Sequence, residues 1–205
     1  MTALPVAYPI TDTRISGLSH AEQVEVLASA GASVIQLRDK TASPLEFYKS
    51  ALKALDVARA FNVTIIINDR VDVAVASGAD GVHLGQDDIP PSAARRLLGA
   101  DKIIGYSTHN LDQAIQAESE PVDYIAIGPV FDTATKAQPD PTVGLDLVRR
   151  VRERIKRPLV AIGGITLDRA SVVLAAGAQS LAVISDLYSV GDPASRLKAY
   201  LQLVR

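Results

Sequence analysis

Three related stretches of the chain predict its fold. The first, Leu27-Ala28-Ser29-Ala30-Gly31-Ala32, precedes the apolar run Val34-Ile35-Gln36-Leu37. The second runs from Val75-Ala76-Ser77-Gly78-Ala79-Asp80 to Gly81-Val82-His83-Leu84, and the third from Leu174-Ala175-Ala176-Gly177-Ala178 to Leu181-Ala182-Val183-Ile184. This pattern is typical of a helix end, a glycine in the left-handed conformation, and a strand buried on both faces. Each stretch is therefore the returning half of a βαβ unit.

The spacing of these stretches predicts how many units the chain contains. Gly31, Gly78 and Gly177 are separated by 47 and 99 residues, which fits two and then four units of about 24 residues each. We therefore expect eight strands, near Ala7–Ile10, Ser33–Leu37, Thr64–Ile67, Gly81–Leu84, Lys102–Gly105, Tyr124–Ile127, Leu159–Ile162 and Leu181–Ile184.

Helical patterns fall between the strands, and several begin at Pro or Asp, as helix starts often do. The expected helices are near Ala21–Ala30, Pro44–Ala60, Val71–Ala76, Pro91–Leu98, Leu111–Glu118, Leu145–Ile155, Asp168–Ala176 and Pro193–Leu203. Strict alternation without a linker favours an α/β fold, a closed (β/α)8 TIM barrel formed as one domain by residues 1–205. An open dinucleotide-binding sheet is disfavoured, because no G-x-G-x-x-G motif follows a strand.

Bulk composition excludes several function classes. The net charge is −2, so the chain lacks the excess of basic residues that would attract nucleic acid. The chain has no cysteine, which leaves only oxygen or nitrogen ligands for a metal. The first residues lack the features of a signal peptide, and no apolar run approaches the roughly 20 residues of a membrane helix. We expect a soluble cytoplasmic protein that acts on small molecules; the sequence does not decide between a monomer and a homo-oligomer.

The end of the second strand carries two cations. In Gln36-Leu37-Arg38-Asp39-Lys40, strand alternation places Gln36, Arg38 and Lys40 on one side and Leu37 and Asp39 on the other. If the first side faces the barrel mouth, desolvating two cations is costly unless an anion such as pyrophosphate neutralises them. The alternative is a structural salt bridge to nearby carboxylates.

Carboxylates follow the third and fourth strands, in Asn68-Asp69-Arg70 and Gly85-Gln86-Asp87-Asp88. Asp69 with Asp88 or Asp87 would offer hard oxygen ligands from neighbouring strand ends, and Mg²⁺ usually takes one or two carboxylates with waters and substrate phosphates. Helix capping is the simpler explanation for each residue singly. His83 is compatible with metal binding or catalysis, and equally with a hydrogen-bonded core histidine.

Three later strand ends carry small or hydroxyl residues. The sixth strand leads into Gly128-Pro129-Val130-Phe131-Asp132-Thr133-Ala134-Thr135-Lys136, whose hydroxyls, backbone N–H groups and ammonium suit an anionic ligand. Gly163-Gly164 after the seventh strand and Ile184-Ser185 after the eighth match the phosphate site that such barrels often build there. A polar surface loop and a tight turn without a ligand are the alternatives.

Ser107 and His109 follow the fifth strand. Ser107 could bond a ligand or cap the next helix. A Ser-His nucleophile pair is a weak interpretation, because the sequence offers neither a nucleophile elbow nor an orienting partner.

Taken in order, these motifs resemble the thiamine phosphate synthase family over nearly the whole chain. The family joins a hydroxymethylpyrimidine pyrophosphate to a hydroxyethylthiazole phosphate, giving thiamine phosphate and pyrophosphate with Mg²⁺. The resemblance implies that Arg38, Lys40, Asn68 and Lys136 hold the pyrophosphate, with Gln36 and Ser107 beside the pyrimidine. It implies Asp69 and Asp88 as magnesium ligands, Asp88 being chosen over Asp87 by its position in the motif. It also implies a thiazole phosphate site formed by Thr133, Thr135, Gly164, Ile184 and Ser185.

The resemblance implies an alkyl transfer in which pyrophosphate leaves first and the pyrimidine stabilises a cationic methylene, with Arg38, Lys40, Ser107 and Lys136 as the catalytic set. Two other functions remain open. A thiazole tautomerase of the same superfamily would transfer a proton through a histidine such as His109, and a sensor would bind phosphate ligands without turnover. The proline-rich segment 137–144 is expected to form a mobile lid.

Overall fold

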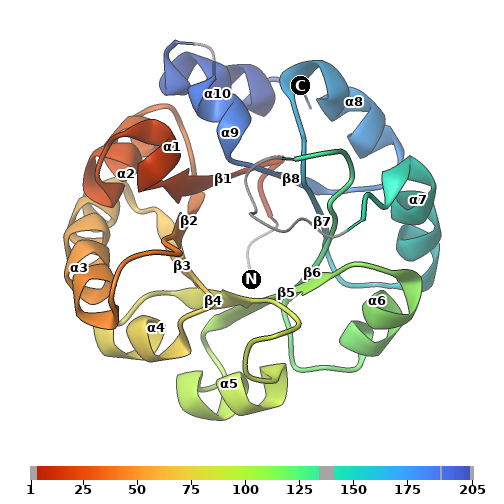
Figure 1. Cartoon of the computed structure of the whole chain (residues 1–205), viewed down its shortest axis with the longest axis horizontal. Helices are drawn as coiled ribbons and strands as arrows, with labels where there is room; N and C mark the ends of the chain where they lie inside the picture. The colour runs from red at the N-terminus through yellow and green to blue at the C-terminus, as the bar shows by residue number, and fades with distance from the viewer. Residues whose placement is uncertain (1–3, 134–140, 190, 204–205) are drawn as a thin grey trace.

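Eight parallel strands close into a barrel in the computed structural model, which describes residues 4–133, 141–189 and 191–203. Figure 1 looks along the barrel and shows the strands as an inner ring with the longer helices around it. Each strand pairs with the next in the sequence, and β8 pairs with β1. The predicted (β/α)8 barrel is confirmed.

The strands lie close to the predicted ranges. They are β1 (Ala7–Asp12), β2 (Val34–Arg38), β3 (Thr64–Asn68), β4 (Gly81–Leu84), β5 (Ile103–Thr108), β6 (Tyr124–Ile127), β7 (Leu159–Ile162) and β8 (Ser180–Val183). β1 and β5 run further than expected, so Asp12 and Ser107 lie within strands.

The longer helices also match the predicted pattern. They are α2 (His20–Ser29), α3 (Pro44–Phe61), α4 (Val71–Ser77), α5 (Pro91–Leu98), α6 (Leu111–Glu118), α7 (Gly144–Arg154), α8 (Leu167–Ala175) and α10 (Pro193–Leu201). Ser19 and Ser43 start α2 and α3 with capping boxes, in which serine and a glutamate three residues later satisfy exposed N–H groups. Among the described residues, no helix is both long and apolar enough to cross a membrane.

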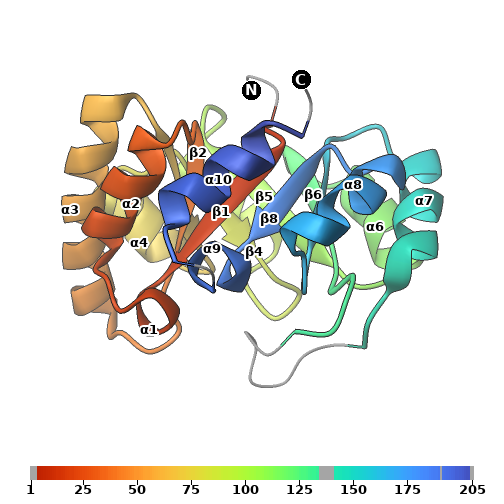
Figure 2. The ribbon, with the colours of Figure 1, turned by 90° about the horizontal axis from the view of Figure 1, so that it is seen from above.

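Two short helices were not predicted, α1 (Thr13–Ser16) after β1 and α9 (Ser185–Tyr188) after β8. Four residues are too few to display a helical period, which explains why the sequence pattern did not reveal them. Figure 2 shows both at the same end of the barrel, where β1 and β8 finish. They therefore border the carboxyl ends of the strands.

The core has two layers separated by the sheet. Outward side chains such as Leu37, Ile67 and Leu181 pack under the helices, while Tyr8, Ile66 and Tyr124 belong to a smaller cluster inside the barrel. The residues of both clusters are almost completely buried, so side chains fill the interior as they do in other (β/α)8 barrels. This rigid frame fixes the relative positions of the strand ends.

Candidate functional site

A cavity of about 420 Å³ opens at the carboxyl ends of the strands. Its lining comes from loops and strand ends between β2 and α9, and it brings together most of the residues that the sequence singled out. Those residues are Arg38, Lys40, Asn68, Asp69, His83, Asp87, Asp88, Ser107, His109, Thr133, Gly164, Ile184 and Ser185.

The cationic side of the cavity is formed by Arg38 and Lys40. Both line the cavity, whereas Leu37 is buried in the outer core, so the predicted alternation of faces is confirmed. Each cation has a carboxylate partner: Arg38 donates to Asp12, and Lys40 donates to Asp69. The Arg38 side chain is 13% exposed and the Lys40 side chain 52% exposed, so Arg38 belongs to the wall and Lys40 remains accessible to a ligand.

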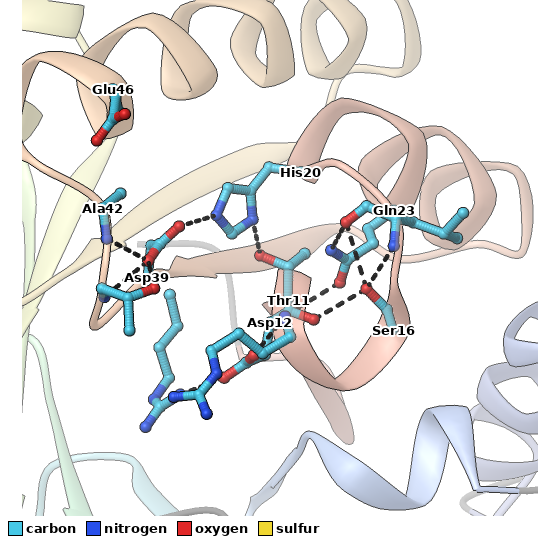
Figure 3. A network of polar contacts seen from close by, with 12 residues as sticks. Thr11, Asp12, Ser16, His20, Gln23, Asp39, Ala42 and Glu46 are labelled. Carbon is cyan, nitrogen blue, oxygen red and sulfur yellow. Dashed lines mark hydrogen bonds and ion pairs between the residues drawn. The ribbon is translucent and has the colours of Figure 1, made fainter.

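A polar network behind this wall holds the ends of β1 and β2 (Figure 3). One oxygen of Asp12 accepts from the backbone N–H groups of Arg14 and Ile15, while its other oxygen accepts from Arg38. His20 lies between Thr11 and Asp39, with Nδ1 2.7 Å from the Thr11 hydroxyl oxygen. Asp39 caps the loop after β2 by accepting from the backbone of residues 41 and 42. Arg38 is therefore held in place by a carboxylate that is itself fixed.

Asp69 and Asp88 form a carboxylate pair on the neighbouring wall. Asp88 accepts from the Gly85 backbone N–H at 2.7 Å, and desolvation together with the nearby charge of Asp69 raises the Asp88 pKa. Asp69 has a left-handed backbone with φ of 62°, an uncommon conformation for a residue with a side chain. Two carboxylates this close repel each other, which disfavours the ionisation of both unless a cation lies between them.

The donor set fits a hard divalent cation. Carboxylate oxygens suit Mg²⁺, which keeps waters and substrate oxygens in its remaining positions. Within the described ranges, no group of three or more His, Asp or Glu side chains could hold a metal unaided. Asp88 is half-buried and faces Asp69, whereas Asp87 is exposed, so the geometry favours Asp88 as the second ligand.

Asn68 adds an unused donor to this wall. The residue is 8% exposed, and its side-chain amide nitrogen has no hydrogen bond partner among the described residues. A buried amide without an acceptor costs free energy of about 1–3 kcal/mol, which a ligand oxygen would recover. The cavity therefore offers a ready donor next to its cations.

The opposite wall is a tight turn after β7. Gly164 has φ of 61°, and a Cβ atom there would lie 2.4 Å from the Asp132 carbonyl oxygen. The loop after β6 runs beside this turn: Val130 N–H donates to the Ile162 carbonyl at 2.9 Å, and Phe131 N–H to the Gly163 carbonyl at 3.0 Å. This pairing brings Thr133 to the cavity beside Gly164 and the start of α9.

The residues of the inner layer lie at and below the cavity floor. Ser107 lines the cavity, and the Nε2 atom of His83 lies 2.8 Å from the Ser107 hydroxyl oxygen. Burial lowers the pKa of His83 to about 4, which keeps the ring neutral. Gln36 is 2% exposed, does not line the cavity, and bonds the Tyr8 hydroxyl inside the barrel. His109 lines the cavity and donates from Nδ1 to the Gly128 carbonyl at 2.6 Å.

Comparison with known proteins places the chain in a family. Residues 7–187 match the model of the family described as thiamine monophosphate synthase. The chain belongs to the thiamine monophosphate synthase family. It is 43% identical over 198 residues to the thiamine-phosphate synthase of Chloroflexus aurantiacus, covering 96% of this chain and 91% of that protein. It is 45% identical over 202 residues to the Methanocella arvoryzae thiamine-phosphate synthase, covering 97% and 95%.

A solved structure supports the same family. The thiamine phosphate pyrophosphorylase of Pyrococcus furiosus has a TM-score of 0.87 and 35% identity, covering 97% of this chain and 94% of that one. A KDPGal structure has a TM-score of 0.74 at 17% identity, which shows a shared fold alone. The predicted resemblance to the thiamine phosphate synthase family is confirmed.

Some site residues were missed by sequence reasoning, and others lie outside the structural description. Asp12 was not assigned to the site although it ends β1, and Gln86 lines the cavity while donating to the Ser107 carbonyl at 2.7 Å. Their position at strand ends was the signal that could have identified them. Thr135 and Lys136 lie outside the described residues, as does the 137–140 part of the predicted lid.

Proposed function

We propose that the chain catalyses the reaction of its family, joining a pyrimidine pyrophosphate to a thiazole phosphate to give thiamine phosphate and pyrophosphate. One observation carries the proposal: a single cavity combines a cationic and carboxylate wall on β2 to β4 with a glycine turn on β7 and the start of α9. Two phosphorylated substrates that must react with each other need two such anion sites facing one space.

The first wall suits the pyrophosphate of the pyrimidine substrate. Arg38 and Lys40 would neutralise its oxygens, and the unused amide of Asn68 would donate to it. Lys136 is assigned to the same group. Because Lys40 forms an ion pair with Asp69, binding of pyrophosphate would exchange this partner for a phosphate oxygen.

Charge balance explains why this wall needs a divalent cation. The described lining has two cationic side chains, Arg38 and Lys40, and three carboxylates, Asp69, Asp87 and Asp88. These two cations do not outweigh the three carboxylates, so pyrophosphate approaching this part of the wall would be repelled unless further positive charge were supplied, by Mg²⁺ and by the assigned Lys136. Mg²⁺ held by Asp69 and Asp88 would reverse that balance and neutralise charge on the leaving group.

The second wall suits the phosphate of the thiazole. Gly164, Ile184 and Ser185 would present backbone N–H groups and a hydroxyl, and Thr133 would add a second hydroxyl from the loop after β6. Thr135 is assigned to the same site. The hydrogen bonds between this loop and the β7 turn would keep the two substrates in register.

The chemistry requires positioning more than a strong base. As pyrophosphate leaves, the pyrimidine ring stabilises the cationic methylene, and the thiazole nitrogen attacks that carbon. Ser107, at the floor of the cavity, would bond the pyrimidine substrate, and the filled core beneath would exclude water from the cation. His83 is neutral and already bonded, which fits a structural role in a reaction without proton abstraction.

An assay of both products tests this function. The protein is incubated with the two phosphorylated precursors, with Mg²⁺ or with EDTA, and thiamine phosphate and pyrophosphate are quantified. We expect equal amounts of the two products, and only with Mg²⁺. Absence of thiamine phosphate would refute the synthase function. Isomerisation of a thiazole phosphate without Mg²⁺ would instead support the tautomerase.

A further inference from the structure

A chain of buried hydrogen bonds runs through the barrel from Gln36 to Ser107. Gln36 Nε2 donates to the Tyr8 hydroxyl at 3.1 Å, and the Tyr8 and Tyr124 hydroxyl oxygens are 3.0 Å apart. The Tyr124 hydroxyl lies 2.9 Å from His83 Nδ1, and His83 Nε2 lies 2.8 Å from the Ser107 hydroxyl. The chain joins residues of five strands, β2, β1, β6, β4 and β5 in that order, and ends at the cavity.

The elements of this chain are rigidly packed. Tyr8 and Tyr124 are each 1% exposed, and their rings meet edge to face with centroids 5.9 Å apart. The Tyr124 ring also stacks on His83 with centroids 5.5 Å apart. Gly105 makes room for Tyr124, because a Cβ atom at this position would lie 2.0 Å from the Tyr124 ring. The hydroxyls therefore have few alternative partners.

The amide of Gln36 sets the direction of every hydrogen bond in the chain. Within the described residues the Tyr8 hydroxyl has only Gln36 and Tyr124 as hydrogen bond partners, and Gln36 donates to it. Donation from Tyr8 to Tyr124 is therefore the arrangement that leaves no buried O–H group unpaired. By the same reasoning Tyr124, whose hydroxyl has only Tyr8 and His83 as partners within the described residues, donates to His83 Nδ1. A neutral imidazole that accepts at Nδ1 carries its hydrogen on Nε2, which donates to Ser107.

We propose that this chain makes the Ser107 hydroxyl an obligate hydrogen bond donor toward the cavity, with Gln36, Tyr8, Tyr124 and His83 as positioning residues. Ser107 accepts from His83, and within the described ranges His83 is its only side-chain partner, so its own hydrogen is left for a ligand. Resting on the proposed function, the acceptor would be an atom of the pyrimidine pyrophosphate.

Burial keeps the members of the chain in the protonation states that this direction needs. It raises the pKa of Tyr8 to about 12 and raises that of Tyr124 well above the ordinary value. It lowers the pKa of His83 to about 4. At neutral pH both tyrosines are therefore protonated and the imidazole is uncharged.

The histidine tautomer is the most direct test, and it needs neither substrate nor turnover. Long-range ¹H–¹⁵N correlation spectra of the ¹⁵N-labelled protein at pH 7.5 report which ring nitrogen carries the hydrogen, with His83 signals assigned by their loss in His83→Asn. We expect a bare Nδ1 and a protonated Nε2. The opposite tautomer, or a doubly protonated ring, would overturn the proposal even if the protein proves to be an active synthase.

Kinetics test the consequence for Ser107. Tyr124→Phe removes the donor to His83 without adding volume, and we expect kcat/KM for the pyrimidine pyrophosphate to fall about tenfold, with a mixture of His83 tautomers. Tyr8→Phe should have a smaller effect, because Tyr124 can still donate. KM for the thiazole phosphate should be unchanged in both variants.

Tyr48→Phe is the matched control, since this tyrosine lies on α3 outside the barrel. It should change neither the tautomer nor kcat/KM. If Tyr124→Phe folds with the wild-type tautomer and the wild-type kcat/KM, the proposal is wrong. If that variant does not fold, the His83 tautomer of the wild type still tests the proposal, and Tyr8→Phe still tests its effect on kcat/KM.

Discussion

Replacing Asp88 by Asn should stabilise the free protein while abolishing its response to magnesium. In the free protein, burial and the charge of Asp69 both disfavour ionised Asp88, as its raised pKa indicates. Asn keeps the size and an oxygen that can accept from the Gly85 N–H, so the hydrogen bond at 2.7 Å is preserved. The substitution therefore removes mainly a repulsive charge.

The size of this stabilisation follows from the surroundings of the Asp69 and Asp88 carboxylates. Two unit charges about 4 Å apart repel by about 4 kcal/mol at an effective dielectric constant of 20. Lys40 offsets part of this repulsion through its bond to Asp69, whose side chain is 20% exposed to water. We expect the free energy of unfolding to rise by about 1 kcal/mol, which corresponds to a rise in Tm of about 2–4 °C for a chain of this size.

Thermal unfolding in two buffers measures both effects. In EDTA, Asp88→Asn should melt above the wild type. With Mg²⁺ and inorganic pyrophosphate at a hundred times its Kd, the free energy of unfolding of the wild type should rise by about 2.7 kcal/mol, whereas that of the variant should change little. Asp87→Asn is the matched control, because it makes the same charge change at the adjacent exposed carboxylate. A variant that melts below the wild type in EDTA, and responds to Mg²⁺ and pyrophosphate as the wild type does, would refute this reasoning.

Three further perturbations test other parts of the site. Arg38→Ala should lower kcat/KM at least about 100-fold, because it removes a phosphate contact and leaves Asp12 unpaired; Arg59→Ala, which breaks an exposed ion pair on α3, should not change the rate. Gly164→Ala should raise KM for the thiazole phosphate at least about tenfold by displacing the turn from the Asp132 carbonyl, and an unchanged KM would place that phosphate elsewhere. Burial lowers the pKa of His83 from 6.5 to about 4 in the folded protein. Between these pH values the unfolded chain binds a proton that the folded protein does not. The free energy of unfolding is therefore highest above pH 6.5 and falls by about 3 kcal/mol as the pH is lowered toward 4. Urea unfolding between these pH values should show this slope and should show less of it in His83→Asn; equal slopes would refute the assignment.

Helix and strand order could be predicted because each unit repeats the same local chemistry. An alanine-rich helix end, a glycine and a short apolar strand recur, and strand alternation correctly separated Leu37 from Arg38 and Lys40. Parallel strands of a closed barrel end at one rim, so residues distant in sequence could be expected to meet there. The family resemblance then gave those residues roles.

Other features depend on tertiary geometry that local patterns do not encode. The pairing of Arg38 with Asp12 links two strands whose relative stagger is set by the barrel as a whole. Alternation also predicted the side on which Gln36 lies but not its depth, which places it one layer below the cavity and next to Tyr8. The short helices α1 and α9 lack the length for a periodic signal, although they border the site.

A crystal structure with Mg²⁺, pyrophosphate and thiamine phosphate would test most directly whether two anion sites face each other across one cavity. We expect pyrophosphate on Arg38, Lys40 and Asn68, with Mg²⁺ between it and the carboxylates of Asp69 and Asp88. The phosphate of thiamine phosphate should lie on the Gly164 turn beside Ser185. Both anions bound to the same wall, or either one outside the cavity, would contradict this arrangement.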